Sequence, residues 1–232
     1  MKIELCAASI EAINFAKKYN FDRIELCQNL EQGGLTPSDG LIQFAIEKGL
    51  STHVLIRVRP GGFVYSNEEV EVMLNDIKRC VQLGVDGIVI GALRVNGEID
   101  TDVIKQMISC AKNLEVTFHR AFDECKNIER SITTLIELGF KRILSSGTKT
   151  NVEEGIDALQ EMKEFSNRKI EIMIGGGVSA NNVRRLMETV QPDAVHFSGT
   201  KNQTIDENSM FSESIFAADE DKIHDILAEI RQ

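Results

Sequence analysis

The sequence lacks several features that would place it in a common class of protein. It has no apolar stretch near the ~20 residues that a membrane-spanning helix needs. Residues 1–15 contain no basic segment followed by an apolar run, so we expect no signal peptide and a cytoplasmic location. With 26 Lys and Arg against 36 Asp and Glu, the net charge is -10. This balance argues against nucleic acid or an anionic membrane as the main partner, although a local basic pocket is compatible with it.

Paired metal-binding cysteines are also lacking. There is no CxxC pair, which argues against a structural zinc site. The five cysteines are odd in number and widely scattered along the chain. This pattern fits free thiols in a reducing cytoplasm better than a disulfide framework.

Strand and helix patterns alternate from one end of the chain to the other, with no linker or composition break. Strands are expected at residues 2–6, 22–27, 53–59, 86–91, 115–120, 141–146, 169–174 and 193–198. Helices are expected at residues 9–19, 38–48, 67–83, 101–111, 127–138, 151–165, 180–188 and 219–230. Eight such units predict an α/β protein with one closed (β/α)8 barrel, a TIM barrel, over residues 1–232. An open doubly wound sheet is the alternative, but no GxGxxG follows the first strand.

The longest stretch without a helical pattern is the polar segment 199–218, after the last strand. Loops of this length are commonly lids, binding loops or contacts with another subunit. We therefore expect a homo-oligomer, in the first instance a dimer.

Alternate residues of a barrel strand point into the lumen, and the outward set should be the uniformly apolar one. This test places a largely polar set inside: Glu4, Cys6, Glu25, Cys27, His53, Leu55, Arg57, Arg59, Thr117, His119, His196 and Ser198. Barrel lumens are normally filled by branched apolar side chains. Buried charges must pair or bind something. Either Glu4 and Glu25 neutralise Arg57 and Arg59 in a structural network, or the set forms a site.

A functional site is favoured over a structural network because the polar residues lie at the carboxyl ends of the strands, where barrel enzymes have their active sites. The clearest case is residues 117–123 (TFHRAFD), where a strand ends in His119, Arg120 and Asp123. These three residues are candidate catalytic groups. His119 or His196 would serve as acid or base near neutral pH, with Glu4 or Glu25 as partner or base.

The same end of the barrel holds candidate anion-binding groups. Arg57 and Arg59 are bidentate donors that could clamp a negative charge. Glycine turns follow the last two strands, and their backbone N–H groups can approach an anion. They contribute Gly176 and Gly177 after the seventh strand, and Ser198 and Gly199 after the eighth. Ser146, after the sixth strand, adds a hydroxyl. The alternative is that these glycines only permit tight turns.

Cys6 and Cys27 are expected on neighbouring strands, pointing the same way near the barrel mouth. Paired thiolates suit a soft ion such as Cu(I). The alternative is that both are small buried hydrophobic residues, which is the commoner role of free cysteine.

Five segments resemble the CutC family: residues 23–27 (RIELC), 33–38 (GGLTPS), 117–123 (TFHRAFD), 142–147 (RILSSG) and 175–178 (GGGV). The resemblance covers about residues 1–200. It implies a cytoplasmic TIM-barrel protein with a role in copper homeostasis, binding Cu(I) through Cys27 with Cys6 as a further ligand. The alternative from the residues themselves is an enzyme acting on a small anionic substrate, bearing phosphate or carboxylate, at the barrel mouth.

Two departures from the family pattern stand out. The family usually reads IRPRGG at the third strand, whereas residues 56–62 read IRVRPGG. Both arginines are retained, but the proline is displaced. The second cysteine linked to copper in some members lies just before the third strand, where this chain reads GLSTH at residues 49–53. Cys6 or His53 would have to replace it.

Overall fold

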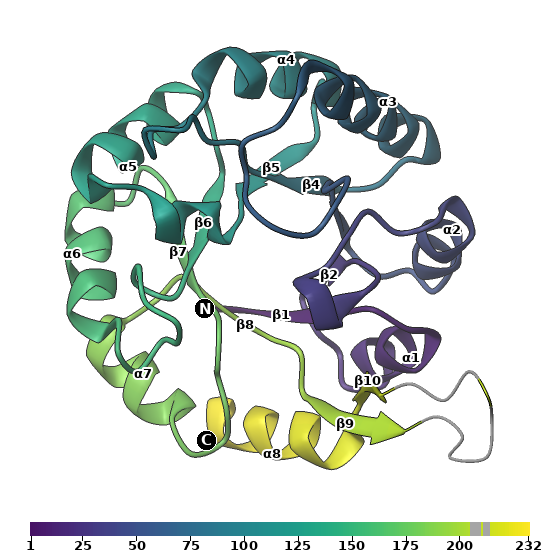
Figure 1. Cartoon of the computed structure of the whole chain (residues 1–232). Helices are drawn as coiled ribbons and strands as arrows, with labels where there is room; N and C mark the ends of the chain where they lie inside the picture. The colour runs from purple at the N-terminus through teal and green to yellow at the C-terminus, as the bar shows by residue number, and fades with distance from the viewer. Residues whose placement is uncertain (205–209, 211–213) are drawn as a thin grey trace.

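The computed structural model describes residues 1–204, 210 and 214–232. Its centre is a closed barrel of parallel strands in the order β1-β2-β3-β4-β5-β6-β7-β8, which confirms the predicted fold (Figure 1). The strands are β1 (Lys2–Ala7), β2 (Arg23–Leu26), β3 (Thr52–Leu55), β4 (Gly87–Ile90), β5 (Glu115–Phe118), β6 (Arg142–Ser145), β7 (Glu171–Ile174) and β8 (Ala194–Phe197).

An outer ring of α-helices surrounds the barrel, as Figure 1 shows. The helices are α1 (Ile10–Lys18), α2 (Asp39–Glu47), α3 (Asn67–Leu83), α4 (Thr101–Ala111), α5 (Ile128–Glu137), α6 (Ile156–Ser166), α7 (Val183–Val190) and α8 (Glu220–Ile230). Two short 3-10 helices, η1 (Leu30–Gln32) and η2 (Arg120–Glu124), follow β2 and β5. Their place at the carboxyl ends of strands is where a barrel keeps its site.

Apart from α6 and α7, the helices begin at a side chain that accepts a hydrogen bond from a backbone N–H of the first turn. Ser66 accepts a hydrogen bond from the backbone N–H of Glu69, whose side chain accepts one from the Ser66 N–H. This capping box fixes the start of α3, and Gly84 ends the helix in the left-handed conformation with φ 80. The loop between β3 and α3, which borders the pocket, is therefore held at its far end.

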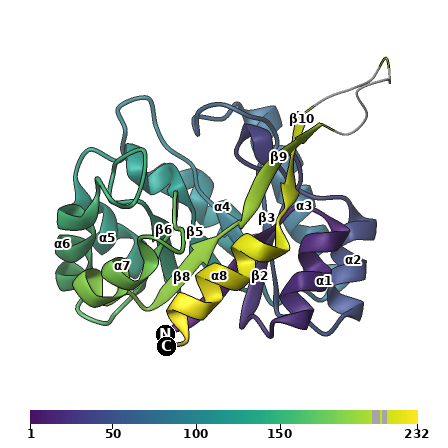
Figure 2. The same cartoon turned by 90° about the horizontal axis from the view of Figure 1, so that it is seen from below.

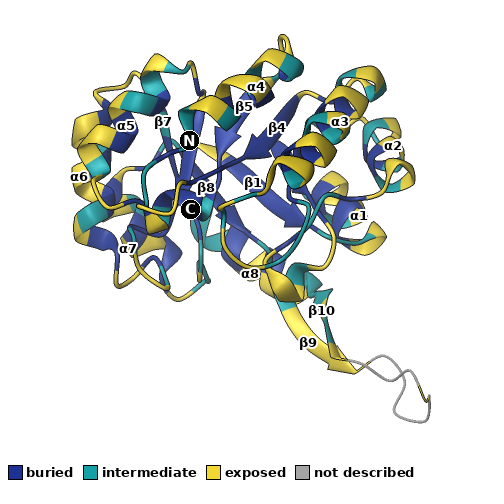
Figure 3. Cartoon of the chain, turned by 45° about the horizontal axis from the view of Figure 1, so that its top comes forward, coloured by how far each residue is buried: buried dark blue, intermediate teal, exposed yellow. Residues whose placement is uncertain are grey.

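The two faces of the barrel sheet differ as the alternation predicts. Outward residues such as Leu5, Ile24 and Phe118 are fully buried against the helices, whose outer faces are exposed (Figure 3). The lumen holds charged groups and two apolar clusters: Cys6, Cys27, Leu55 and Val89 in one, and Leu144, Met173 and Ala194 in the other. Charged and apolar side chains therefore occupy different layers of the lumen.

One charged layer lies at the amino ends of the strands, and sequence reasoning missed its arginines. Arg142 is completely buried and donates to Glu115 at 2.5 Å and to Glu171 at 3.0 Å. Arg23, also buried, forms an ion pair with Glu4. The structural hypothesis that Glu4 neutralises Arg57 or Arg59 is therefore wrong. The alternation rule already placed Arg23 inside, because it lies two residues before Glu25.

The segment after β8 forms an antiparallel ribbon of β9 (Thr200–Thr204) and β10 (Ser214–Ala218). Figure 2 shows this ribbon projecting from the barrel on the side away from the two termini. Of the predicted loop 199–218, residues 205–209 and 211–213 lie outside the described residues. In the described part of the chain, no helix combines the length and apolarity needed to cross a membrane.

Candidate functional site

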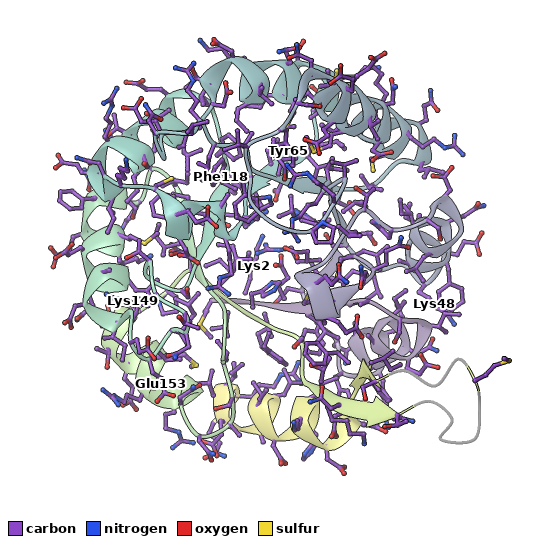
Figure 4. All side chains as sticks on the ribbon, viewed as in Figure 1. Lys2, Lys48, Tyr65, Phe118, Lys149 and Glu153 are labelled. Carbon is purple, nitrogen blue, oxygen red and sulfur yellow. The ribbon has the colours of Figure 1, made fainter. Side chains whose placement is uncertain are left out.

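A pocket of about 740 Å³ opens at the carboxyl ends of the barrel strands. Loops after most strands contribute to its wall. Among the predicted site residues, its lining includes Cys6, Glu25, Arg57, His119, Arg120, Asp123, Gly176, Gly177, His196 and Ser198. Figure 4 shows Lys149, another lining residue, on the loop before α6 and Tyr65 on the loop before α3. The structure thus brings most of the predicted residues to one cavity.

His119 lies where β5 gives way to η2. Its Nδ1 accepts a hydrogen bond from the Ala121 backbone N–H at 3.1 Å, which leaves the proton on Nε2. Burial, with the charge of Arg57 as a second cause, lowers the pKa of His119 to about 3. The ring is therefore neutral at pH 7 and offers a hydrogen-bond donor. This differs from the predicted acid or base, which requires a pKa near the working pH.

The Nε2 atom of His119 is buried and has no hydrogen-bond partner among the described residues. Space for the ring depends on Gly91, because a Cβ added there would lie 2.5 Å from His119 Cε1. Phe63 packs beside the ring with a centroid distance of 4.9 Å. An unsatisfied buried donor costs about 1–3 kcal/mol, so this group is prepared for an acceptor that the protein does not supply.

Arg57 lies beside the same aromatic ring, with its guanidinium carbon 5.3 Å from the Phe63 centroid. Its Nη1 donates to the carbonyls of Gln32 and Gly34, each at 3.0 Å, and its Nη2 to Gly61 at 2.6 Å. These acceptors are neutral, and the Nε atom is buried without a partner. No ion pair joins Arg57 to an acidic residue in the described chain, so its charge is not neutralised by a carboxylate.

Arg59 is not in the lumen, which corrects the prediction of a paired arginine clamp. It forms an ion pair with Glu69 and donates to the carbonyls of Gly62 and Val64. The reason is that β3 ends at Leu55, so the strand alternation no longer applies four residues later. Arg59 instead holds the β3–α3 loop against the start of α3.

Asp123 and Ser146 form hydrogen bonds that hold the loop after β6 in place. Asp123 accepts hydrogen bonds from the hydroxyls of Ser145 at 2.5 Å and Ser146 at 2.9 Å. It also accepts from the backbone N–H groups of Ser146 and Thr148. These contacts make Asp123 and Ser146 positioning residues that fix the loop.

Arg120 reaches from η2 to this loop and to the glycine turn after β7. Its Nε donates to Asp123 at 2.8 Å, and its Nη2 donates to Ser146 Oγ at 2.6 Å. A Cβ added at Gly176 would lie 3.0 Å from the Arg120 guanidinium, so the guanidinium packs closely on this glycine. Gly176 and Gly177 both have positive φ, 99 and 85. The Nη1 atom of Arg120 has no hydrogen-bond partner among the described residues.

The turn after β8 contributes fewer residues to the pocket than predicted. Ser198 lines the pocket and shares a hydrogen bond with Thr200. Gly199 is not part of the lining: a Cβ there would meet Ile223 at 2.4 Å, which shows that it packs against α8. Its glycine is explained by this contact and by its φ of 55.

The opposite wall of the pocket carries Cys6, Glu25 and His196. The Cys6 sulfur lies 3.9 Å from Glu25 Oε1 and 3.8 Å from the Cys27 sulfur. His196 Nδ1 lies 2.7 Å from Glu4 Oε1. Cys27 is completely buried and does not line the pocket, because Leu55 and the Gly34 turn cover it.

Electrostatics in this wall favour the protonated forms. Burial raises the pKa of Glu25 to about 7. The neighbouring Cys27 and burial raise the pKa of the Cys6 thiol. The pKa of His196 is also raised: burial works against this, but Glu25, Cys6 and Glu4 together outweigh it. Burial thus disfavours the charged forms of Glu25 and Cys6, whereas His196 is favoured in its charged form by its acidic neighbours.

The fold and the pocket together define a (β/α)8-barrel protein with a polar cavity at the carboxyl ends of its strands. Comparison with known proteins makes this more specific. The model of the CutC family matches residues 1–201. The chain belongs to the CutC family.

Individual relatives agree with this assignment. A CutC protein from Glaesserella parasuis is 38% identical over 227 residues, 97% of this chain and 93% of the relative. One from Bacteroides fragilis is 42% identical over 201 residues, 86% of this chain and 80% of the relative. The crystal structure of CutC from Streptococcus agalactiae, described as a candidate copper homeostasis protein, superposes with a TM-score of 0.80. It has 38% identity and covers 84% of this chain and 98% of its own.

Proposed function

We propose that this protein is an enzyme acting on a small anionic substrate in the pocket at the barrel mouth. The observation that carries the proposal is the pair of buried donors, Arg57 Nε and His119 Nε2, that have no partner in the described protein. Both side chains line the pocket and flank Phe63. Donors held in this way need an acceptor, and an oxyanion or carbonyl oxygen satisfies them.

Each donor has a distinct role in this proposal. Arg57 supplies positive charge from a buried position, where electrostatic attraction is stronger than in water. His119 remains neutral, so it polarises a substrate oxygen without losing its proton. Arg120, with Nη1 beside Gly176, extends the donor surface toward the glycine turn. Movement of Phe63 would give a ligand access to the two buried donors.

The rim of the pocket limits the charge of the substrate. Glu124 and Glu154 line it together with Arg120 and Lys149. Such mixed charge suits a small molecule with one anionic group and additional hydroxyl or carbonyl groups. The carboxylates of Glu124 and Glu154 would repel a substrate with several negative charges.

Binding of simple anions tests this proposal. Inorganic phosphate and acetate are titrated into the protein, and amide and His119 ring resonances are followed by NMR. We expect shifts at His119, Gly176 and Gly177, and about tenfold weaker binding in His119→Phe, which removes one donor. Arg94→Gln, in an exposed ion pair, is the control and should bind normally. If neither anion perturbs the pocket, or if His119→Phe binds as the wild type does, the proposal fails.

Copper binding is the second candidate, and the 3.8 Å separation of the Cys6 and Cys27 sulfurs favours it. Metal–sulfur bonds of about 2.3 Å allow one ion to contact two sulfurs this close. Two thiolates are ligands that Cu(I) prefers. The residues present therefore fit the ion, and His196 could supply a third donor.

For the copper candidate, we expect tight one-to-one Cu(I) binding under anaerobic, reducing conditions, measured by competition with a Cu(I) chelator. Cys27→Ser and Cys6→Ser should each weaken it by more than about tenfold, because each removes one of two thiolates. Cys110→Ser, a partly buried thiol on α4, is the matched control. Weak binding that is unchanged in both site variants would reject a copper role for these thiols.

We retain a cytoplasmic location and a homodimer as predictions. The location is supported by the free thiols, which suit a reducing compartment, and fractionation of the native host tests it. The ribbon of β9 and β10 projects from the barrel and exposes Phe216, which suits a subunit contact. Sedimentation equilibrium of the wild type and of Phe216→Ser measures it. A wild-type monomer would exclude the dimer.

A further inference from the structure

The wall of the pocket opposite Arg57 brings together three groups that commonly bind metals. One potential ligand atom from each of Cys6, Glu25 and His196 lies within 4.8 Å of those of the other two. The three residues come from β1, β2 and β8, which are neighbours in the barrel because β1 pairs with both others. All three are buried, and all three line the pocket.

The carboxylate of Glu4, on the side of the ring away from the pocket, fixes the orientation of His196. Its Nδ1 lies 2.7 Å from Glu4 Oε1, and Glu4 is held in turn by its ion pair with Arg23. This arrangement leaves Nε2 as the nitrogen available to the cluster. A carboxylate behind a histidine is the usual outer contact of a metal-binding imidazole, since it fixes the tautomer and ring orientation.

Glu25 supplies an independent observation. Its side chain is 5% exposed, and its Oε2 atom is buried without a hydrogen-bond partner. It forms no ion pair with any described residue, because the nearby Arg23 pairs with Glu4. A buried carboxyl oxygen without a partner is unfavourable. A metal ion bound between Glu25, Cys6 and His196 would satisfy this vacant oxygen.

We propose that Cys6, Glu25 and His196 bind one divalent transition-metal ion, Zn²⁺, with an open coordination position facing the pocket. Sulfur, nitrogen and oxygen donors in one set match the borderline softness of Zn²⁺, whereas Cu(I) selects thiolates. Three protein ligands with a fourth position open are typical of catalytic zinc sites. The site stands on its ligands alone and does not depend on the proposed function. If both hold, the ion and the Arg57–His119 donors face one substrate from two sides.

The test uses Co²⁺ as a spectroscopic probe and Zn²⁺ as its competitor, with the chelator-treated full-length protein under reducing conditions. We expect one Co²⁺ per chain, a thiolate-to-metal charge-transfer band, and displacement by Zn²⁺. Cys6→Ser should remove the band, and Glu25→Gln and His196→Gln should weaken Co²⁺ binding by more than about tenfold. Cys110→Ser, which changes a partly buried thiol on α4 away from the pocket, is the matched control and should leave both the band and the affinity unchanged.

The outcomes separate this site from the copper pair. Loss of Co²⁺ binding in Cys27→Ser, with normal binding in Glu25→Gln, would overturn the proposal in favour of a two-thiol site. The absence of one-to-one binding or of a thiolate band in the wild type would also overturn it. Should a variant fail to fold, ¹¹³Cd NMR of the wild type decides instead. A chemical shift typical of one sulfur ligand supports the site, and one typical of two or none contradicts it.

Discussion

Replacing Arg23 with methionine is expected to lower the free energy of unfolding at pH 7 by about 3–5 kcal/mol, because removing one partner leaves the other charge buried. Glu4 is completely buried and pairs with Arg23 and His196. Burial alone would raise the pKa of Glu4, but His196 and Arg23 outweigh it and hold that pKa well below its usual value. Without Arg23, the carboxylate loses one of its two cationic partners. Urea unfolding followed by circular dichroism measures the change.

Two controls distinguish this effect from lost packing. Arg79→Met breaks the Arg79–Asp39 pair, whose side chains are 48% and 56% exposed, and should cost no more than about 1 kcal/mol. The double variant Arg23→Met with Glu4→Gln removes both charges and should be more stable than Arg23→Met alone. If Arg23→Met costs no more than Arg79→Met, the ion pair does not stabilise the barrel as described.

Acid is expected to destabilise the protein through His119, and His119→Gln should reduce this sensitivity. The folded pKa of about 3 lies below the ordinary value of 6.5. As the pH falls through 6.5, the unfolded chain gains a proton that the folded ring does not accept. The stability contributed by the neutral ring is therefore complete above pH 6.5 and is lost on acidification, at about 1.4 kcal/mol per pH unit. Between pH 6.5 and 4 this amounts to about 3 kcal/mol for one histidine.

The measurement is the free energy of unfolding of the wild type and of His119→Gln at several pH values from 4 to 7. The wild type should lose stability faster than the variant as the pH falls. His53, whose pKa burial lowers to about 4, gives both proteins the same additional slope. His224→Gln, an exposed position on α8, serves as the control and should follow the wild type. Equal slopes for the wild type and His119→Gln would show that His119 is not held neutral by the fold.

The fold could be predicted from the sequence because strand alternation and helix periodicity are local patterns. The same alternation correctly placed Glu4, Cys6 and Glu25 inside the barrel. It failed for Arg59, because the rule holds only while the strand lasts and no local pattern marks its end at Leu55. The roles of Arg57 and Asp123 also could not be predicted. Arg57 donates to carbonyls after β2, and Asp123 accepts from hydroxyl and backbone groups at the end of β6, so their main partners come within reach only in the folded chain.

The sequence also could not predict which charged residues form ion pairs with each other. Arg142 is buried by Glu115 and Glu171 on the two neighbouring strands, and this depends on strand register. The neutral state of His119 likewise depends on burial and on Arg57, which lies 62 residues earlier in the chain. Residue types in the sequence indicated where the candidate site lies. The protonation states of its residues could be inferred only from the three-dimensional structure.

The central claim, that the barrel mouth binds an anionic ligand through Arg57 and His119, is tested most directly by locating an anion in crystals. Selenate resembles phosphate in shape and charge, and its selenium can be identified by anomalous diffraction. The account predicts anomalous density in the pocket within hydrogen-bonding distance of Arg57 or His119, together with a displaced Phe63. Selenate found only at exposed arginines and lysines outside the pocket, with Phe63 unchanged, would contradict it.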